Sequence, residues 1–289
     1  MKQKEMNDTA IIMLNYNQCE NCIKSVNTLL KNYLIPKIVL VDNCSTDNSF
    51  EILANEYTNV SHVYLIKTSM NNGYSFGNNN GIDFIRCFLP KVKYIFICNP
   101  DVLIEESNIF VDACNMLNNR NVGAVTVNSS YKTFGENYLP SGWYFETKKS
   151  LCFQFSKVKI KNKSLISINL IKRYIKKTGN NFYKVDCCQG CFFGIKLETL
   201  ISIKCFDENV FLYYEEEMLG KKIKKKHLQS YVLLNHQLLH NHSLNNKNSR
   251  FLRKEFLKSR MYYIRKYYSH HLLIIFFSNI IIKKALKAM

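Results

Sequence analysis

Short apolar runs alternate with amphipathic stretches along the first half of the chain. The runs are TAIIML, KIVLV, HVYLI, YIFIC and GAVTV, and stretches of helical periodicity separate them at residues 20–31, 46–57, 75–88 and 105–117. Apolar runs of this length, rich in β-branched and aromatic side chains, predict buried strands. Their alternation with helices predicts βαβ units, and therefore an α/β fold with a mostly parallel sheet and helices on both faces.

Polar residues follow each of the first four predicted strands. They are Asn15 and Asn17, then Asp42, then Asn71 and Gly73, and finally Asn99-Pro100-Asp101. Because the carboxyl ends of parallel strands share one edge of the sheet, where open α/β sheets bind ligands, we expect these residues to gather there. Pro100 has no N–H and a fixed φ, so it ends the fourth strand. An ordinary Asn-Pro-Asp turn is the alternative explanation.

The usual nucleotide-binding loops are missing from the sequence. No G-x-x-x-x-G-K-[ST] occurs, and the spaced glycines Gly73, Gly77 and Gly81 do not form G-x-G-x-x-G. A dinucleotide-dependent oxidoreductase is therefore disfavoured. Carboxylates and amides would have to hold the ligand, and a diphosphate held by carboxylates needs a bridging cation such as Mg²⁺ or Mn²⁺.

The second half of the chain is less regular. Residues 131–185 are rich in lysine and weakly patterned, which predicts a variable insertion, and strand-like sequence resumes at YKVDCCQGCFFGIKLETL. Glu215, Glu216 and Glu217 then open a helix that ends in lysines, an arrangement that complements the helix dipole at both ends. The run SYVLL predicts one more strand.

Composition adds a charge asymmetry and a cysteine pattern. The 289 residues are 47% hydrophobic, which is ample for a core, and the net charge is +18. Residues 221–289 hold sixteen lysines and arginines and a single acid, Glu255. Eleven cysteines and an N-terminus without an apolar core favour a reduced, cytosolic compartment. The pairs Cys19/Cys22 and Cys188/Cys191 leave a zinc site open, although buried hydrophobic cysteines fit better.

The basic last segment predicts helices. Residues 250–268 carry apolar side chains at helical spacing with basic residues between them, and LLIIFFSNIII at 272–282 is too short for a membrane span, which needs about 20 residues. One interpretation is an interfacial helix on an anionic membrane surface. The other is a helix packed on the body of the protein or on a second subunit of a homodimer. Nucleic-acid binding is disfavoured because no RNA- or DNA-binding module is recognisable.

Seven sequence pieces, in order, resemble one family. They are IIMLNYN, IVLVDNCSTDNS, NNGYSFGNNNGI, CNPDV, CCQGCFFGIKLETL, FDENVFLYYEEEMLG and LLHNHS. The chain is similar to the family 2 glycosyltransferases with the GT-A fold, in particular the rhamnosyltransferase-like members that build bacterial surface polysaccharides such as capsule and O-antigen. The resemblance implies a GT-A domain over residues 1–245, and the basic helical region then occupies 246–289. The resemblance also implies an inverting enzyme that moves a sugar from a nucleotide-sugar donor to a glycan or polyprenyl-linked acceptor. Together with the basic segment and the cysteines, this predicts an enzyme that is peripheral on the cytoplasmic face of the membrane.

The resemblance also implies roles for individual residues. Asp101 matches the last acid of the family's DxD motif and His240 matches its histidine after the last strand, so both would hold Mg²⁺ or Mn²⁺ on the donor diphosphate, with His242 as a second histidine. Gly190 matches a glycine on the acceptor side. The donor-binding residues would be Asn15, Asn17, Asp42, Asn71, Gly73, Asn79 and Asn99.

The catalytic base falls in the acidic triplet. Glu216 occupies the position of the family's base, where Asp is commoner, and the adjacent Glu215 is the alternative. An acidic helix start also satisfies the helix dipole without any catalytic role. Two other functions stay open: a non-catalytic scaffold with this fold, and a sugar nucleotidyltransferase, whose Gly-rich basic loop near the N-terminus this sequence lacks.

Overall fold

The computed structural model describes residues 6–31, 37–106, 108–131, 141–148, 151, 179–240 and 249–287. The first half of the chain forms β1 (Thr9–Asn15), α1 (Cys19–Leu30), β2 (Lys37–Asp42), α2 (Ser49–Tyr57), β3 (Val63–Lys67), α3 (Tyr74–Phe88), β4 (Tyr94–Cys98), β5 (Val102–Leu103), α4 (Asn108–Leu117) and β6 (Val122–Tyr131). Every strand and helix predicted for this half is confirmed, with boundaries that differ by at most a few residues.

In the second half, the described residues form further strands and helices. They are β7 (Gly142–Trp143), β8 (Phe182–Val185), β9 (Cys187–Cys188), β10 (Phe192–Lys196), α7 (Leu197–Ser202), α8 (Glu215–Lys225), β11 (Gln229–His240), α9 (Ser249–Tyr267) and α10 (Leu272–Lys287). Most of the predicted variable insertion, residues 131–185, lies outside the described residues. Its described part contributes β7, which pairs with β9, and β8, which pairs with β11.

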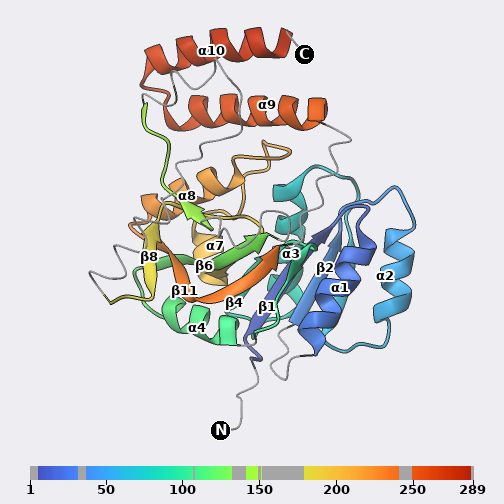
Figure 1. The fold of residues 1–289 in the computed structure, drawn as a ribbon. Helices are drawn as coiled ribbons and strands as arrows, with labels where there is room; N and C mark the ends of the chain where they lie inside the picture. The colour runs from blue at the N-terminus through green and yellow to red at the C-terminus, as the bar shows by residue number, and fades with distance from the viewer. Residues whose placement is uncertain are drawn as a thin grey trace.

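One central sheet organises the molecule (Figure 1). Its strand order over the described residues is β3-β2-β1-β4-β10-β6-β11-β5, with β8 beside β11. The strands β3, β2, β1 and β4 are parallel, as the βαβ pattern predicts. The strand β10 runs antiparallel between β4 and β6, whereas β6 and β11 are again parallel. The α/β fold with a mostly parallel sheet is therefore confirmed.

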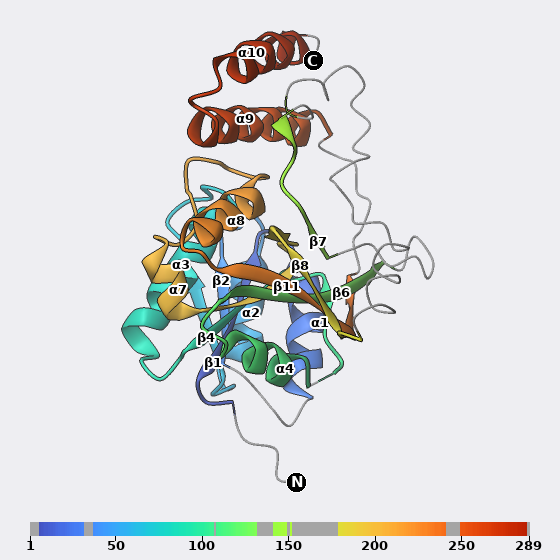
Figure 2. The same ribbon diagram turned by 90° about the vertical axis from the view of Figure 1, so that its left-hand side faces the viewer.

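Helices cover both faces of this sheet, and alternate residues of each strand supply the two cores. On one face, Ile11 and Phe96 pack with residues of α1, α2 and α4. On the other face, Ile12 and Ile97 pack with residues of α3, α7 and α8. Figures 1 and 2 show the two helical layers from the side and after a quarter turn. Strands buried on both faces need near-continuous apolar sequence, which is why runs such as YIFIC carry no alternation.

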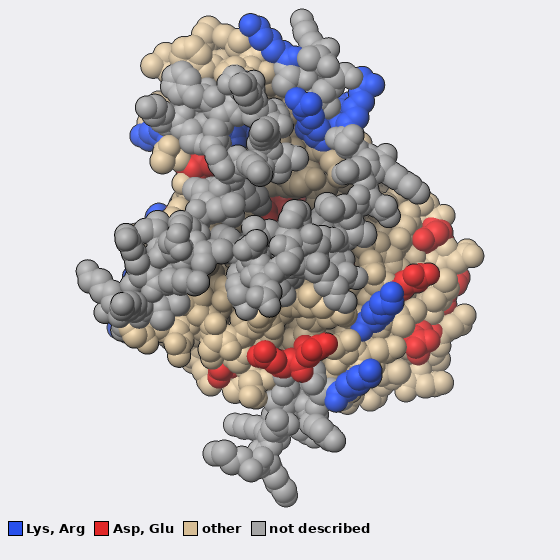
Figure 3. Space-filling model, in the orientation of Figure 1, with Lys and Arg blue, Asp and Glu red and all other residues tan. Residues whose placement is uncertain are grey.

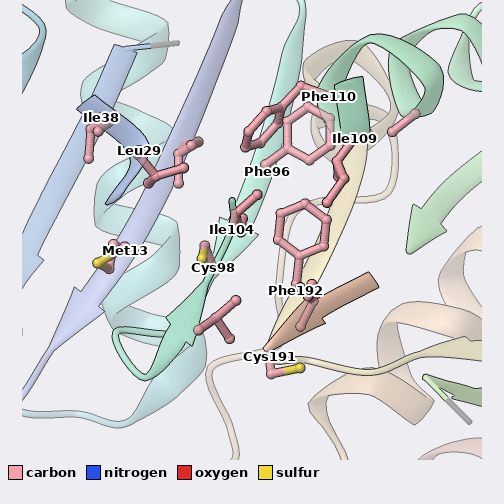
Figure 4. Close-up of a cluster of buried hydrophobic side chains, with 14 of the residues drawn as sticks. Met13, Leu29, Ile38, Phe96, Cys98, Ile104, Ile109, Phe110, Cys191 and Phe192 are labelled. Atoms are coloured by element: carbon pink, nitrogen blue, oxygen red, sulfur yellow. The ribbon is translucent and has the colours of Figure 1, made fainter. Parts of the chain in front are cut away.

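A cluster of aromatic rings joins β4, α4 and β10 (Figure 4). The ring centroids of Phe96 and Phe110 are 4.9 Å apart, and the ring of Phe192 lies 5.7 Å from Phe96 and 6.0 Å from Phe110. All three side chains are fully buried. Burying one such ring contributes about 1.5–3 kcal/mol. Because Phe192 directly follows Cys191, this cluster fixes the turn that precedes β10.

The helices α9 and α10 form an antiparallel hairpin at one end of the molecule (Figures 1 and 2). A third core cluster joins this hairpin to the body through Tyr263, Ile264 and Ile274, which pack with Tyr214 and Met218. The predicted C-terminal helices are confirmed, and α9 packs on the body. None of the helices in the described part of the chain is long and apolar enough to cross a membrane.

Candidate active site

The carboxyl ends of β1 and β2 share a buried hydrogen-bond network. Asn15 and Asp42 are register partners and are fully buried. The Asn15 amide donates to Asp42 Oδ2 at 2.8 Å, and the Ser45 hydroxyl donates to the same oxygen at 2.6 Å. The exposed Asn17 donates its backbone N–H to Ser45 Oγ at 3.0 Å, and its side chain bonds Thr46. This network holds the Asp42 carboxylate rigidly at the strand-end edge.

The loop after β3 depends on Gly73. The Asn43 amide donates to Asn71 Oδ1 at 3.0 Å and to the Gly73 carbonyl at 3.2 Å. Gly73 has a φ of +92°, and a Cβ there would lie 2.1 Å from the Phe211 carbonyl oxygen. The Tyr74 backbone N–H donates to that same carbonyl at 3.0 Å. Glycine is therefore required where this loop meets the segment before α8.

The fourth strand ends in a short pairing that brings Asp101 to His240. The strand β4 ends at Cys98, and β5 then pairs antiparallel with β11, which places His240 opposite Val102. The Asp101 Oδ1 atom lies 3.2 Å from His240 Nε2, and both side chains are largely buried. Burial lowers the pKa of the His240 imidazole, but hydrogen bonds to Asp101 and Cys191 outweigh it and raise the pKa to about 11. Asp101 and His240 therefore form an ion pair.

The turn Gln189-Gly190-Cys191, between β9 and β10, connects this strand end to the acidic helix. The Asn99 backbone N–H donates to the Cys191 carbonyl at 2.8 Å. The Gly190 N–H donates to Glu216 Oε1 at 3.2 Å, and the Tyr74 hydroxyl donates to the Gly190 carbonyl at 2.8 Å. A Cβ on Gly190 would lie 3.0 Å from Glu216 Oε1. One turn thus contacts the loop of Asn99, the start of α3 at Tyr74 and the start of α8.

The three glutamates at the start of α8 occupy different surroundings. Glu215 and Glu217 are buried, and Glu217 Oε1 accepts a hydrogen bond from the indole N–H of Trp143 at 3.1 Å. Glu216 faces Gly190. Burial raises the pKa of the Tyr74 phenol, and the negative charges of Glu215 and Glu216 raise it further. Tyr74 therefore stays a hydrogen-bond donor at neutral pH, and the acidic triplet gathers next to the strand-end edge.

The structure brings most of the predicted site residues together but not all. Asn15, Asn17, Asp42, Asn71, Gly73, Asn99, Asp101, His240 and Glu216 lie in these connected networks. Glu215 is buried next to Glu216 at the start of α8. Asn79 lies further along α3, where its amide donates to Glu208 Oε1 at 2.6 Å and its carbonyl oxygen accepts the Phe206 N–H at 3.0 Å. Its donor-binding role stays a prediction. His242 lies outside the described residues.

Three further residues belong to this site although the sequence did not single them out. Ser45 lies inside the piece IVLVDNCSTDNS, three residues after Asp42, so its place near Asp42 could have been predicted from the sequence. Tyr74 and Trp143 reach the site through partners that are more than seventy residues away in sequence. No local pattern predicts such contacts.

The residues at the Asp101 end suit a hard divalent cation. Mg²⁺ is usually bound by one or two carboxylates together with substrate phosphates and water, rather than by a cage of protein ligands. The single, largely buried carboxylate of Asp101 fits that description. Within the described ranges, no group of three or more His, Cys, Asp or Glu side chains could hold a metal ion, so the two CxxC pairs form no zinc site there. Cys22, Cys188 and Cys191 are instead buried.

The fold and the polar strand-end edge define the GT-A class of glycosyltransferases. The model of Glycosyl transferase family 2 matches residues 10–203, well over half of the chain, and the protein belongs to this family. The low-salt glycan biosynthesis hexosyltransferase Agl10 of Haloferax volcanii is 24% identical over 218 residues, which are 75% of this chain and 61% of that protein. The chain thus spans under two thirds of that relative's length.

Two solved structures are similar in fold. The crystal structure of GalNAc-T7 with UDP, GalNAc and Mn²⁺ has a TM-score of 0.64 at 12% identity, covering 89% of this chain and 47% of that one. The mannosyltransferase PcManGT from Pyrobaculum calidifontis, in complex with GDP-Man and Mn²⁺, has a TM-score of 0.59 at 13% identity, covering 98% of this chain and 76% of that one. At such identities these structures establish the fold alone.

Replacing Gly73 by Ala should destabilise the protein strongly. The left-handed backbone costs a residue with a Cβ about 1–2 kcal/mol, and the rigid Phe211 carbonyl at 2.1 Å adds a clash. Gly179→Ala is the matched control, because Gly179 also has a positive φ, +68°, but its Cβ would meet nothing within 4 Å. Urea denaturation should give a loss of about 3 kcal/mol for Gly73→Ala and about 1 kcal/mol for Gly179→Ala. Equal losses would contradict this reading of the loop.

Proposed function

We propose that this protein transfers a hexose from a nucleotide-sugar donor to a hydroxyl of a glycan or polyprenyl-linked acceptor. The observation that carries the proposal is the Gln189–Cys191 turn, which holds the Asp101 end of the sheet edge and the Glu216 carboxylate next to each other. A transferase needs both: a place for the donor diphosphate and a base on the far side of the sugar. The glycan-building relative and the two sugar-nucleotide complexes support the same reaction class.

The donor would lie along the strand-end edge. Asn15, Asp42 and Ser45 form the rigid floor for the nucleoside, and Asn71 with Gly73 forms the neighbouring wall. Asp101 would hold Mg²⁺ or Mn²⁺ against the diphosphate. For His240 to bind the same cation, its imidazole must give up the proton that it shares with Asp101. When bound, that cation stabilises the charge that develops on the leaving phosphate. The Mn²⁺ in both solved relatives supports this choice of metal.

Glu216 would act as the base. Its carboxylate is held by the Gly190 N–H, so it is fixed in position to accept the proton of the attacking hydroxyl. A direct attack of this kind, on the face opposite the leaving diphosphate, inverts the anomeric carbon. Glu215, which is buried behind it, is the alternative base. A role in capsule or O-antigen assembly, and membership of the rhamnosyltransferase-like branch, belong to this proposal and draw support from the glycan biosynthesis named for the archaeal relative.

The exposed face of α10 would bring the enzyme to the membrane surface that carries a polyprenyl-linked acceptor. Leu272, Leu273, Phe276 and Phe277 are exposed, and Leu272 and Leu273 keep 76% and 72% of their surface in contact with solvent. The antiparallel hairpin places the basic start of α9 beside the exposed Lys283 and Lys284 of α10, and Figure 3 shows blue side chains gathered at that end. Apolar side chains beside positive charge suit an anionic leaflet, such as the inner face of a cell membrane.

Donor binding is tested by a thermal shift with UDP, GDP, dTDP and CDP, each with and without Mn²⁺. We expect one nucleotide to raise the Tm when Mn²⁺ is present, because a ligand at 100 times its Kd stabilises the native state by about 2.7 kcal/mol. Asp101→Asn should abolish this shift. Asp83→Asn, at an exposed acid of α3 paired with Arg86, should keep it. An unchanged shift in Asp101→Asn would show that Asp101 holds no metal.

The base is tested by Glu216→Gln in a transfer assay. The substitution keeps the shape of the side chain and an oxygen to accept the Gly190 N–H, but it removes the proton acceptor. We expect kcat to fall about 10²–10⁴-fold with the nucleotide-induced Tm shift retained. Glu215→Gln should have the smaller effect, and the reverse order would move the base to Glu215. Wild-type turnover in both variants would favour a scaffold.

Membrane attachment is tested by sedimentation with vesicles of phosphatidylglycerol and phosphatidylcholine. The wild type should sediment with anionic vesicles and less so as salt rises, because screening weakens attraction between charges. Leu273→Ser combined with Phe276→Ser should release it. Phe88→Ser removes an equally exposed phenylalanine from α3 and should change nothing. Sedimentation that survives the double substitution would refute a role for this face.

A further inference from the structure

The turn that starts the acidic helix is strained. Tyr213 and Tyr214, directly before Glu215, have φ values of 72° and 67°, a left-handed conformation that side chains with a Cβ rarely adopt. Such residues persist where the surrounding structure over-determines them, and they gather at functional sites. Contacts with other parts of the molecule must therefore stabilise the strained backbone directly before α8.

That support comes from α9. The Ser259 hydroxyl donates to the Leu212 carbonyl at 2.7 Å. Arg260, which is buried, donates from Nη1 to Glu146 Oε1 at 2.7 Å and from Nη2 to Glu146 Oε2 at 2.9 Å. Its Nη1 also donates to the Tyr214 hydroxyl, which itself lies 3.3 Å from Glu146 Oε1. A bidentate, buried guanidinium fixes both of its partners in direction as well as in distance.

The helix α9 contacts the ring of Tyr214 as well as its hydroxyl. The centroid of this ring lies 5.5 Å from that of Phe256 and 5.1 Å from that of Tyr263, both on α9. Next to it along the chain, the ring of Tyr213 packs 5.6 Å from Phe256. Both strained residues are therefore held by the same helix.

The segment 141–148 connects Arg260 of α9 to the acidic triplet at the start of α8. Glu146 binds Arg260, and three residues earlier Trp143 donates to Glu217 of α8. Glu216, between the two anchored positions 214 and 217, makes its own bond to Gly190. The position of its carboxylate is thus set from both sides, by the Gln189–Cys191 turn and by α9.

We propose that Arg260 is a positioning residue for the transfer reaction: through Glu146 and Tyr214 it holds the strained turn that sets Glu216 at the reacting centre. This proposal rests on the function proposed above, and it gives the C-terminal helices a second role besides membrane attachment. Arg260 acts through the turn and touches no substrate.

The test compares Arg260→Met with Lys266→Met. Both remove a cation by which α9 binds the body, but Lys266 pairs with Asp207 at 2.5 Å, away from the turn. We expect kcat of Arg260→Met to fall by about 10²-fold, the cost of a misplacement of about 1 Å at a reacting group, with the nucleotide-induced Tm shift retained. Lys266→Met should keep kcat within about twofold of wild type and should lower the Tm less than Arg260→Met does, because the Lys266 side chain is partly exposed.

The fluorescence of Trp143 provides a readout that is independent of activity. It is the one tryptophan in the sequence, and its indole binds Glu217 in the first turn of α8. Arg260→Met should shift its emission, whereas Lys266→Met should not. Should Arg260→Met not fold, Glu146→Leu combined with Arg260→Met removes both charges and avoids a lone buried ion. This double variant should show the same loss of kcat and the same emission shift.

The possible failures are distinguishable. Arg260→Met or the double variant with the turnover of Lys266→Met would overturn the positioning role, as would an emission spectrum identical to that of the wild type. A wild type that transfers no sugar would refute the proposed function. In that case the emission of Trp143 still decides whether Arg260 sets the geometry of the turn.

Discussion

The site depends on one backbone turn. Gln189-Gly190-Cys191 joins β9 to β10, and its peptide groups bond three separate parts of the chain: Asn99, Tyr74 and Glu216. The partner groups are the backbone N–H of Asn99, the phenol of Tyr74 and the carboxylate of Glu216. Each of these groups loses hydrogen bonds to water when it is buried, and the bond to the turn replaces them. Phe192 packs against Phe96 and Phe110 and keeps the turn in place. This turn therefore fixes the position of α8 relative to the carboxyl end of β4.

This arrangement explains why the fold can serve transfer chemistry. A parallel sheet gathers polar strand ends at one edge, but it leaves the far side of a bound sugar without a catalytic group. The antiparallel β10 solves this, because it returns the chain through the middle of the sheet beside β4. The segment after β10 and α7 then leads α8 to the same edge. The chain belongs to Glycosyl transferase family 2. Under the proposed function, this frame would separate the diphosphate end at Asp101 from the base end at Glu216.

Much of the fold could be predicted from local sequence. Runs such as TAIIML and YIFIC are buried on both faces, so their length and composition alone identify them as strands. Asn15 and Asp42 could be placed together because parallel strands align their carboxyl ends, and the register confirms it. The contacts of Trp143, Tyr74 and Arg260 could not be predicted. Each joins segments more than forty residues apart, and their geometry depends on packing that no periodicity encodes.

The most direct test of the proposed donor site is a crystal structure with Mn²⁺ and the nucleoside diphosphate that stabilises the protein best. Anomalous scattering from Mn²⁺ locates the metal without reference to any relative. We expect a single Mn²⁺ within bonding distance of an Asp101 carboxylate oxygen, with the nucleoside against Asp42 and the Glu216 carboxylate facing the open side of the diphosphate. A Mn²⁺ bound elsewhere, or a nucleotide away from the Asn15–Asp42 edge, would contradict it.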